Sequence, residues 1–316
     1  MHTYFIGTIA LLLTVLVAAT ATAQDASVNS NGEGLVFVAS QFDVEETTEN
    51  ITALMEANEN ITLLGVVDHA AAAASVDLEL LPTCVILFGN PNLGTPLMQE
   101  KQTTALDLPQ KILVWETEDG ETFVGFNSPQ YVAARHGVMD GTEQLETINN
   151  ALSSIVASVT DDSDTVQPAL MSEGAMEVME LMDKGFINVE SANDHATTVE
   201  NVQAILEERG FRVPFVVDHA ISAANNDLDL RPTTLFIFGN PNVGTPFMQL
   251  ERTIAIDLPQ KMLVWEDADG MVLITYNAPA YLFQRAGVAD EDVPENVPNV
   301  ADALAGIAEA AATAAE

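Results

Sequence analysis

Two copies of an adjacent aspartate and histidine are the residues best suited to chemistry. Asp68-His69 and Asp218-His219 each end an apolar run and open an alanine-rich stretch. A histidine at the start of a helix lies beside free backbone N–H groups, where it can hold an anion or, when neutral, a metal. The histidine could also act as a general base that the aspartate orients. The structural alternative is that the aspartate caps the helix and the histidine packs, because adjacent strand residues point to opposite faces.

A loop of sequence FGNP follows a buried apolar run in both copies. We expect Asn90 and Asn240, with the loop N–H groups, to line a small polar pocket beside the histidine. The turn alone would also explain the glycine, asparagine and proline of this loop. Thr95-Pro96 and Thr245-Pro246 then have the residue types of an N-cap and first helical position, so a helix is predicted to start there.

A lysine follows an aspartate by four residues in both copies, as Asp107 and Lys111 and as Asp257 and Lys261. Lysine is scarce in this chain, so a lysine present twice should have a definite role. A buried ion pair is the favoured interpretation, and anion binding is the alternative; Lys111 and Lys261 therefore join the candidate ligand-binding residues.

The candidate metal ligands are weak. Met98 and Met248 would suit copper(I) together with His69 and His219, but packing in the core is the commoner role of methionine. The sequence lacks the motifs GxSxG, HExxH and CxxC and has no glycine-rich phosphate loop. No catalytic residue and no cofactor is therefore assigned.

These residues belong to an internal repeat of 150 residues. VVDHA occurs at 66–70 and 216–220, and FGNPNLGTPLMQ at 88–99 matches FGNPNVGTPFMQ at 238–249. The chain is thus a tandem duplication. We predict repeat unit 1 at 35–160, an acidic linker and Met-rich helix at 161–184, and repeat unit 2 at 185–316, which ends in an alanine-rich helix.

The hydrophobic periodicity predicts an α+β fold. Each unit should hold a roughly five-stranded, mainly antiparallel sheet covered on one face by helices, and Asp119-Gly120 marks a hairpin between the last two strands. In unit 1 the predicted strands lie at 35–39, 61–67, 83–88, 111–116 and 122–127. The predicted helices lie at 44–55, 70–76, 96–101, 128–136 and 142–159.

The repeated motifs DHA, FGNPNxGTPxMQ and DLPQKxLVWE, with a late FNSPQY or YNAPAY element, carry a resemblance. Each unit resembles the bacterial and archaeal family called domain of unknown function 302. The resemblance implies a small α+β domain, and the family has no established reaction to transfer. Unit 1 departs from unit 2 at Leu81 and Cys84, where unit 2 has Arg231 and Thr234.

The charge balance excludes one class of partner. Ten lysines and arginines face 47 aspartates and glutamates, a formal net charge of −37, and this field repels nucleic acid. The hydrophobic fraction of 48% is too high for a disordered acidic chain. An acidic surface of this kind is typical of a halophilic protein, whose carboxylates are screened by molar salt.

The N-terminus is typical of an exported protein. An apolar run at 5–19 precedes Ala21-Thr22-Ala23, so residues 1–23 are predicted to be a signal peptide and 24–34 a leader. The mature chain should be periplasmic or extracellular, without a membrane span. Its single cysteine, Cys84, allows no internal disulfide.

The sequence therefore predicts an exported tandem protein whose units pair as an intramolecular pseudo-dimer. Each unit should bind a small polar ligand, an anion or a metal at the DH strand end and FGNP loop of that unit. The candidate binding residues are Asp68, His69, Asn90, Lys111, Asp218, His219, Asn240 and Lys261. An enzyme with histidine as general base is the first alternative, and a non-catalytic scaffold is the second.

Overall fold

The computed structural model describes residues 28–30, 34–174 and 184–313. The predicted signal peptide, most of the predicted leader and residues 175–183 of the Met-rich segment lie outside the described residues.

Each unit contains one antiparallel sheet in which the first long strand pairs with the last. The order β2-β6-β5-β4-β3 in unit 1 is repeated as β7-β11-β10-β9-β8 in unit 2. In unit 1 these strands are β2 (Leu35–Ala39), β3 (Thr62–Asp68), β4 (Thr83–Gly89), β5 (Gln110–Glu116) and β6 (Thr122–Asn127), with the short β1 (Asn29–Ser30) beside β2. In unit 2 they are β7 (Phe186–Ser191), β8 (Arg212–Asp218), β9 (Thr233–Gly239), β10 (Gln260–Glu266) and β11 (Val272–Asn277). The predicted five-stranded α+β unit and its repetition are confirmed.

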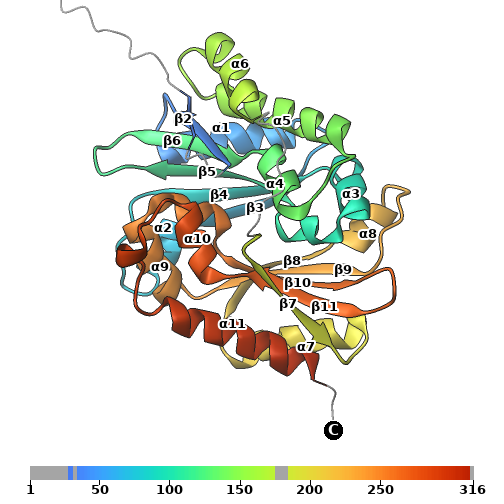
Figure 1. Ribbon diagram of the computed structural model, residues 1–316. Helices are drawn as coiled ribbons and strands as arrows, with labels where there is room; N and C mark the ends of the chain where they lie inside the picture. The colour runs from blue at the N-terminus through green and yellow to red at the C-terminus, as the bar shows by residue number, and fades with distance from the viewer. Residues whose placement is uncertain (1–27, 31–33, 175–183, 314–316) are drawn as a thin grey trace, which may run out of the picture.

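Long helices cover one face of each sheet (Figure 1). The helices on unit 1 are α1 (Val44–Glu56), α5 (Thr142–Ala157) and α6 (Ser163–Gly174), and those on unit 2 are α7 (His195–Glu208) and α11 (Val297–Ala312). Asp43 caps α1 by accepting the N–H of Glu46 at 2.9 Å, as N-cap aspartates do. The alanine-rich C-terminal segment is helical, as its composition predicts.

The two sheet faces that the long helices leave uncovered pack against each other. Along β4, Ile86 and Phe88 belong to the core beneath the unit 1 helices, whereas Val85 and Leu87 belong to a central core shared with Leu235 and other unit 2 residues. Alternate strand residues point to opposite faces, so a run that is apolar at every position is buried on both. The molecule is therefore layered as helices, sheet, sheet and helices (Figure 1).

Short helices fill the margins of the central layer. They are α2 (His69–Ala74), α3 (Pro91–Glu100), α4 (Pro129–His136), α8 (His219–Ala224), α9 (Pro241–Leu250) and α10 (Pro279–Arg285), with the 3-10 turns η1 (Gln102–Leu106), η2 (Arg252–Asp257) and η3 (Asp290–Asp292). Contacts cross between the units in matching pairs: α2 lies on α9, and α3 lies on α8. The turns η1 and η2 likewise lie on the partner unit's strands β10 and β5.

Two local predictions need correction. The helix predicted to start at Thr95-Pro96 starts at Pro91 instead, because Asn90 is the N-cap and its Oδ1 accepts the N–H of Asn92 at 3.0 Å. Asparagine caps at least as well as threonine, and a proline stands at the first helical position in either reading. Thr95 is consequently a buried residue inside the helix.

The segment predicted as an acidic linker is partly a docked helix. Helix α6 begins at Ser163, and its Val166 and Leu170 are buried in the unit 1 core. Asn149 of α5 donates to the carbonyl of Met171 at 2.9 Å. The described part of this segment thus extends unit 1.

Candidate functional site

The two aspartates of the DH pairs are helix caps. Asp68 Oδ1 accepts the N–H of Ala71 at 2.8 Å, and Asp218 Oδ1 accepts that of Ile221 at 2.8 Å. Asp68 is exposed while its neighbour His69 is buried, as expected for adjacent residues at a strand end. The structural alternative therefore accounts for both aspartates, and in the described structure neither carboxylate orients its histidine by a hydrogen bond.

The histidines reach the opposite unit. His69 interacts with the backbone of Leu258 and Ala255 in unit 2, and His219 with the backbone of Leu108 and Ala105 in unit 1. Burial is the main reason that the pKa of each imidazole falls to about 4, against smaller opposing effects of these backbone groups and of the adjacent aspartate. Both rings are thus neutral at pH 7 and supply no positive charge for an anion.

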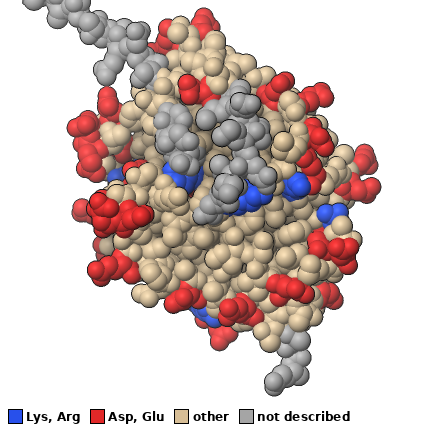
Figure 2. All heavy atoms as spheres, in the orientation of Figure 1, with Lys and Arg blue, Asp and Glu red and all other residues tan. Residues whose placement is uncertain are grey.

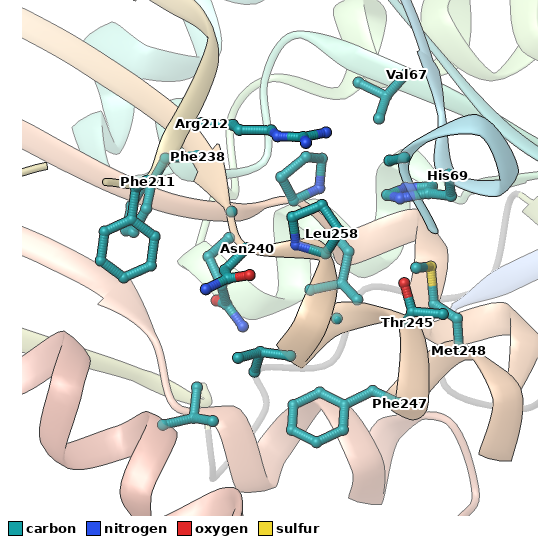
Figure 3. A pocket seen from close by; sticks show the side chains of 18 of the residues that line it. Val67, His69, Phe211, Arg212, Phe238, Asn240, Thr245, Phe247, Met248 and Leu258 are labelled. Atoms are coloured by element: carbon teal, nitrogen blue, oxygen red, sulfur yellow. The ribbon is translucent and has the colours of Figure 1, made fainter. Parts of the chain in front are cut away.

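His69 lines a cavity of about 610 Å³ whose other walls come almost entirely from unit 2 (Figure 3). The polar or soft side chains of unit 2 in this wall include Asn240, Thr245, Met248 and Gln260. We name this space the His69 cavity.

The equivalent His219 cavity has a volume of about 620 Å³. His219 of unit 2 lies there with Asn90, Thr95, Met98 and Gln110 of unit 1. The expected association of the DH strand end with the FGNP loop therefore exists, but between units. The prediction that each unit builds its site alone is wrong, because the faces that carry the histidines pack against the other unit.

Several buried polar atoms of these cavities lack a hydrogen-bond partner in the described structure. In the His69 cavity they are Nε2 of His69, Oγ1 of Thr245 and Oε1 of Gln260. In the His219 cavity they are Nε2 of His219 and Oγ1 of Thr95. A buried polar atom without a partner costs about 1–3 kcal/mol. The histidine Nε2 and the threonine Oγ1 are such atoms in both cavities, whereas Oε1 of Gln260 has no counterpart at Gln110.

The threonines and glutamines are the site residues that sequence reasoning missed. Thr95 and Thr245 have the residue types of helix caps, and the sequence alone does not single out Gln110 or Gln260. The available signal was their identity in both copies, 150 residues apart. Nothing in the local sequence separates such residues from ordinary helix and strand positions.

The weak metal candidates line the two cavities in pairs. His69 and Met248 line one cavity, and His219 and Met98 line the other. Both methionines are also buried in the central core, where they pack. The described residues contain no group of three or more His, Cys, Asp or Glu side chains able to hold a metal.

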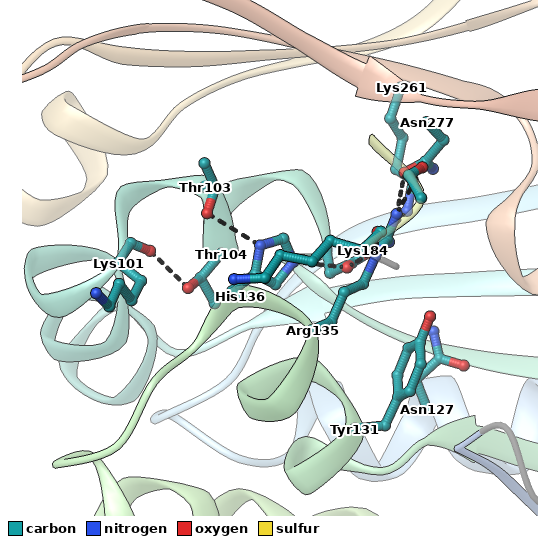
Figure 4. Close-up of polar contacts among 12 residues, drawn as sticks. Lys101, Thr103, Thr104, Asn127, Tyr131, Arg135, His136, Lys184, Lys261 and Asn277 are labelled. Atoms are coloured by element: carbon teal, nitrogen blue, oxygen red, sulfur yellow. Dashed lines mark hydrogen bonds and ion pairs between the residues drawn. The ribbon is translucent and has the colours of Figure 1, made fainter. Parts of the chain in front are cut away.

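The paired charges lie elsewhere, in the buried centre of the interface (Figure 4). Asp107 accepts from Arg135 Nη1 at 2.8 Å and from Lys261 Nζ of the other unit at 2.8 Å. His136 Nε2 lies 2.9 Å from the same carboxylate. These charges hold the pKa of Asp107 well below its usual range even though burial acts to raise it.

The aspartate–arginine pair of this centre has an equivalent in unit 2. Asp257 pairs with Arg285 and with Lys261, the latter at 3.3 Å. The outer nitrogen of each arginine crosses to an asparagine of the other unit: Arg135 to Asn277 at 2.8 Å and Arg285 to Asn127 at 2.6 Å. The hydroxyls of Tyr131 and Tyr281, also 150 residues apart, meet at 2.9 Å. We name these residues the central charge cluster.

The predicted pairing of Lys111 with Asp107 is replaced by a bridge. Lys261 contacts both Asp107 and Asp257, whereas Lys111 makes neither ion pair. Burial, and then the nearby Lys261 ammonium, lower the pKa of Lys111 to about 7. Neither lysine lines the His69 cavity or the His219 cavity, so these two candidate ligand-binding residues are separate from the histidines.

Of the two differences between units, one lies at the interface and the other beneath the unit 1 helices. Arg231, which replaces Leu81 of unit 1, donates from Nε to Gln102 Oε1 of unit 1 at 3.0 Å. Cys84 is a free, partly buried thiol, and burial raises its pKa to about 11. Neither Arg231 nor Cys84 lines the His69 cavity or the His219 cavity.

Part of the chain is similar in sequence to a group of curated proteins. The chain is 47% identical over 105 residues to the "Fluoride-specific ion channel FluC 1" of Brucella suis and of Brucella abortus. The match covers 33% of this chain and 41% and 39% of those proteins, so the chain spans about two fifths of their length. Within the described residues, no helix is both long and apolar enough to cross a membrane.

A solved structure and a family model give the other matches. An uncharacterized conserved protein DUF302 from Bacillus stearothermophilus is 18% identical, with a TM-score of 0.37, over 41% of this chain and 98% of that one. The model described as "Domain of unknown function DUF302" matches residues 36–155 and again 187–311. These two segments make up most of the chain and coincide with the two repeated sheets, and the chain therefore belongs to the DUF302 family as a tandem of two such domains.

Proposed function

We propose that this protein binds small organic molecules, one in each of its two cavities. The ligand has an apolar body and an uncharged head group that both donates and accepts hydrogen bonds, such as an amide or hydroxyl. The observation that supports this is a pair of unpartnered buried polar atoms, a histidine Nε2 and a threonine Oγ1, that recurs in both cavities.

The size and lining of the cavities fit such a ligand. Small-molecule sites are commonly cavities of ~300–1,000 Å³ with apolar walls and a few placed polar groups. The walls of the His69 cavity include Phe211, Phe238, Phe247 and Leu258. Apolar walls favour an apolar body, since its transfer from water is favourable by about 25 cal/mol per Å².

The head group follows from the polar atoms. A neutral imidazole offers one donor or one acceptor at Nε2, a threonine hydroxyl offers both, and Gln260 Oε1 accepts. An uncharged donor and acceptor satisfies these atoms without bringing a buried charge. Because the burial-lowered pKa keeps both histidines neutral, a bare anion would find no counter-charge in this polar set.

Isothermal titration with octanamide in 2 M KCl tests the proposal. We expect two molecules to bind per chain. Thr245→Val should weaken binding at one site and Thr95→Val at the other, each about five- to tenfold, because one hydrogen bond to the head group is lost.

The two valine variants control for each other. Each hydroxyl lacks a hydrogen-bond partner in the described structure, so its removal should leave the melting temperature unchanged or raised. Absence of octanamide binding at millimolar concentration, or unchanged affinity in the double variant, would refute the proposal in favour of a scaffold.

We also propose that the chain is exported and works in concentrated salt. The support is the N-terminal sequence and the net charge of −37, together with the acidic side chains scattered over the visible face in Figure 2. Export predicts that the native protein begins at Gln24, which N-terminal mass spectrometry measures. A native protein that keeps residues 1–23 would contradict this proposal.

A further inference from the structure

We propose that the His69 cavity selects ligands that also carry a carboxylate, and that Arg212 at its mouth is the residue that selects them. This inference rests on the proposed binding function and assigns a substrate class to one of the two sites. The His219 cavity should take the uncharged counterpart.

The position of Arg212 supports this inference. It is the first residue of β8, is exposed, and lines the cavity. Figure 3 shows its side chain extending across the cavity in the direction of His69. Within the described part of the chain, the guanidinium has neither an ion-pair nor a hydrogen-bond partner of its own.

The lack of acidic residues around it is equally informative. The chain has 47 aspartates and glutamates among 316 residues, yet the residues lining the His69 cavity include none. A nearby carboxylate would neutralise the guanidinium and repel an anion. No acidic residue lines the cavity with Arg212, and a ligand carboxylate inside the cavity can form a charge-assisted hydrogen bond with the guanidinium.

The second cavity provides the natural comparison. Thr62 is the equivalent residue of unit 1: it opens β3 and pairs with Gly89, just as Arg212 opens β8 and pairs with Gly239. Thr62 lines the His219 cavity, and neither a lysine, an arginine nor an acid lines that cavity with it. The two cavities therefore share the polar head-group site and differ in charge at the mouth.

The ligand of the His69 cavity is then polar at both ends. Its uncharged donor and acceptor contacts His69, Thr245 and Gln260, its apolar middle contacts the aromatic wall, and its carboxylate reaches Arg212. An ω-hydroxy carboxylate of about eight carbons represents this class. Its amide keeps the same shape without the charge.

The test titrates 8-hydroxyoctanoate and 8-hydroxyoctanamide into the wild-type protein, Arg212→Thr and Thr62→Arg. We expect the wild type to bind one carboxylate per chain about tenfold more tightly than the second, and Arg212→Thr to lose that preference. Thr62→Arg should gain a second tight carboxylate site. The amide should bind all three proteins alike, and Thr245→Val assigns the affected site to the His69 cavity.

The outcomes separate the two proposals. If the amide binds twice but Arg212→Thr changes neither ligand, or changes both equally, the selectivity inference is wrong and the binding function stands. If neither ligand binds any of the proteins, both are wrong. A carboxylate preference that persists in Arg212→Thr would also overturn the role of this residue.

Discussion

At the scale of single residues, the decisive property of the site is that its histidines are uncharged. His69 and His219 are 5% and 6% exposed, and burial lowers the pKa of each to about 4. In an unfolded chain the same rings titrate near pH 6.5. The folded state therefore holds fewer protons than the unfolded state between about pH 6.5 and pH 4.

This difference predicts how stability depends on pH. The free energy of unfolding should fall as the pH drops from 6.5 to 4, by up to about 3 kcal/mol for each histidine, and these two residues should add no further loss below pH 4. The carboxylates of Asp107 and Asp257, whose pKa values are lowered, act below this window.

The double variant His69→Gln with His219→Gln isolates this effect. Urea denaturation in the range from pH 8 to pH 4 should show a clearly smaller loss of stability than in the wild type. Buried His136, whose pKa is also lowered by burial, contributes to the loss that remains. An identical pH dependence in the double variant would show that the histidines are not the titrating groups.

At the scale of elements, the equivalent strands β5 and β10 carry equivalent lysines with different surroundings. Lys111 lies opposite Leu87, and Lys261 lies opposite Ile237, both on the faces that pack together. Lys261 bridges two aspartates, whereas Lys111 is buried beside that ammonium. Two residues in the same register thus have opposite electrostatic environments.

Substitution by methionine should therefore have opposite effects at pH 7. Lys261→Met leaves two buried carboxylates short of a cation and should destabilise the protein by about 3–5 kcal/mol. Lys111→Met removes a poorly compensated buried amine and should be neutral or stabilising, by about 1–2 kcal/mol. Guanidinium denaturation midpoints measure both, and equal destabilisation would contradict the bridge.

At the scale of the whole molecule, the two units should unfold as one. The central core draws on both sheets, and the central charge cluster is completed only by residues of both units. Residues along each strand point alternately to the helix-covered face and to the face in the central core. A separated unit would therefore expose the apolar residues of the second face to water. Cooperative unfolding is the expected consequence.

Calorimetry of the full chain tests this expectation. Ile86 belongs to the core between the unit 1 sheet and its helices, and Phe236 belongs to the equivalent core of unit 2. The variants are Ile86→Ala and Phe236→Ala. In molar KCl each variant should lower the midpoint of the same single transition by several degrees, since either costs about 2–5 kcal/mol. Two transitions that respond separately would show independent units.

The same experiment at lower salt tests salt adaptation. Raising the Debye length from about 3 Å in 1 M salt to about 10 Å in 0.1 M salt restores repulsion among the surface carboxylates. With a net charge of −37, the midpoint should fall markedly in 0.1 M KCl. A midpoint independent of salt would contradict the halophilic proposal.

Much of the architecture is readable in the sequence because it depends on local patterns. The five strands of each unit and the helix caps at Asp43 and Asp68 follow from residues within a few positions of one another, and the tandem repeat is visible because its motifs recur 150 residues apart. The hairpin at Asp119-Gly120 is another case, since Gly120 adopts φ +79°, which glycine permits.

The composition of the site was decided by tertiary structure. The histidine and the FGNP loop are both recognisable in the sequence. Only the packing of sheet on sheet shows that His69 lines one cavity with Asn240, and that His219 lines the other with Asn90. The repeat makes the two copies of each motif indistinguishable in the sequence. Whether a histidine shares a cavity with the FGNP loop of its own unit or of the other unit depends on which face of each sheet packs against the other sheet. These strands are apolar on both faces, so their local sequence pattern is the same for the two arrangements.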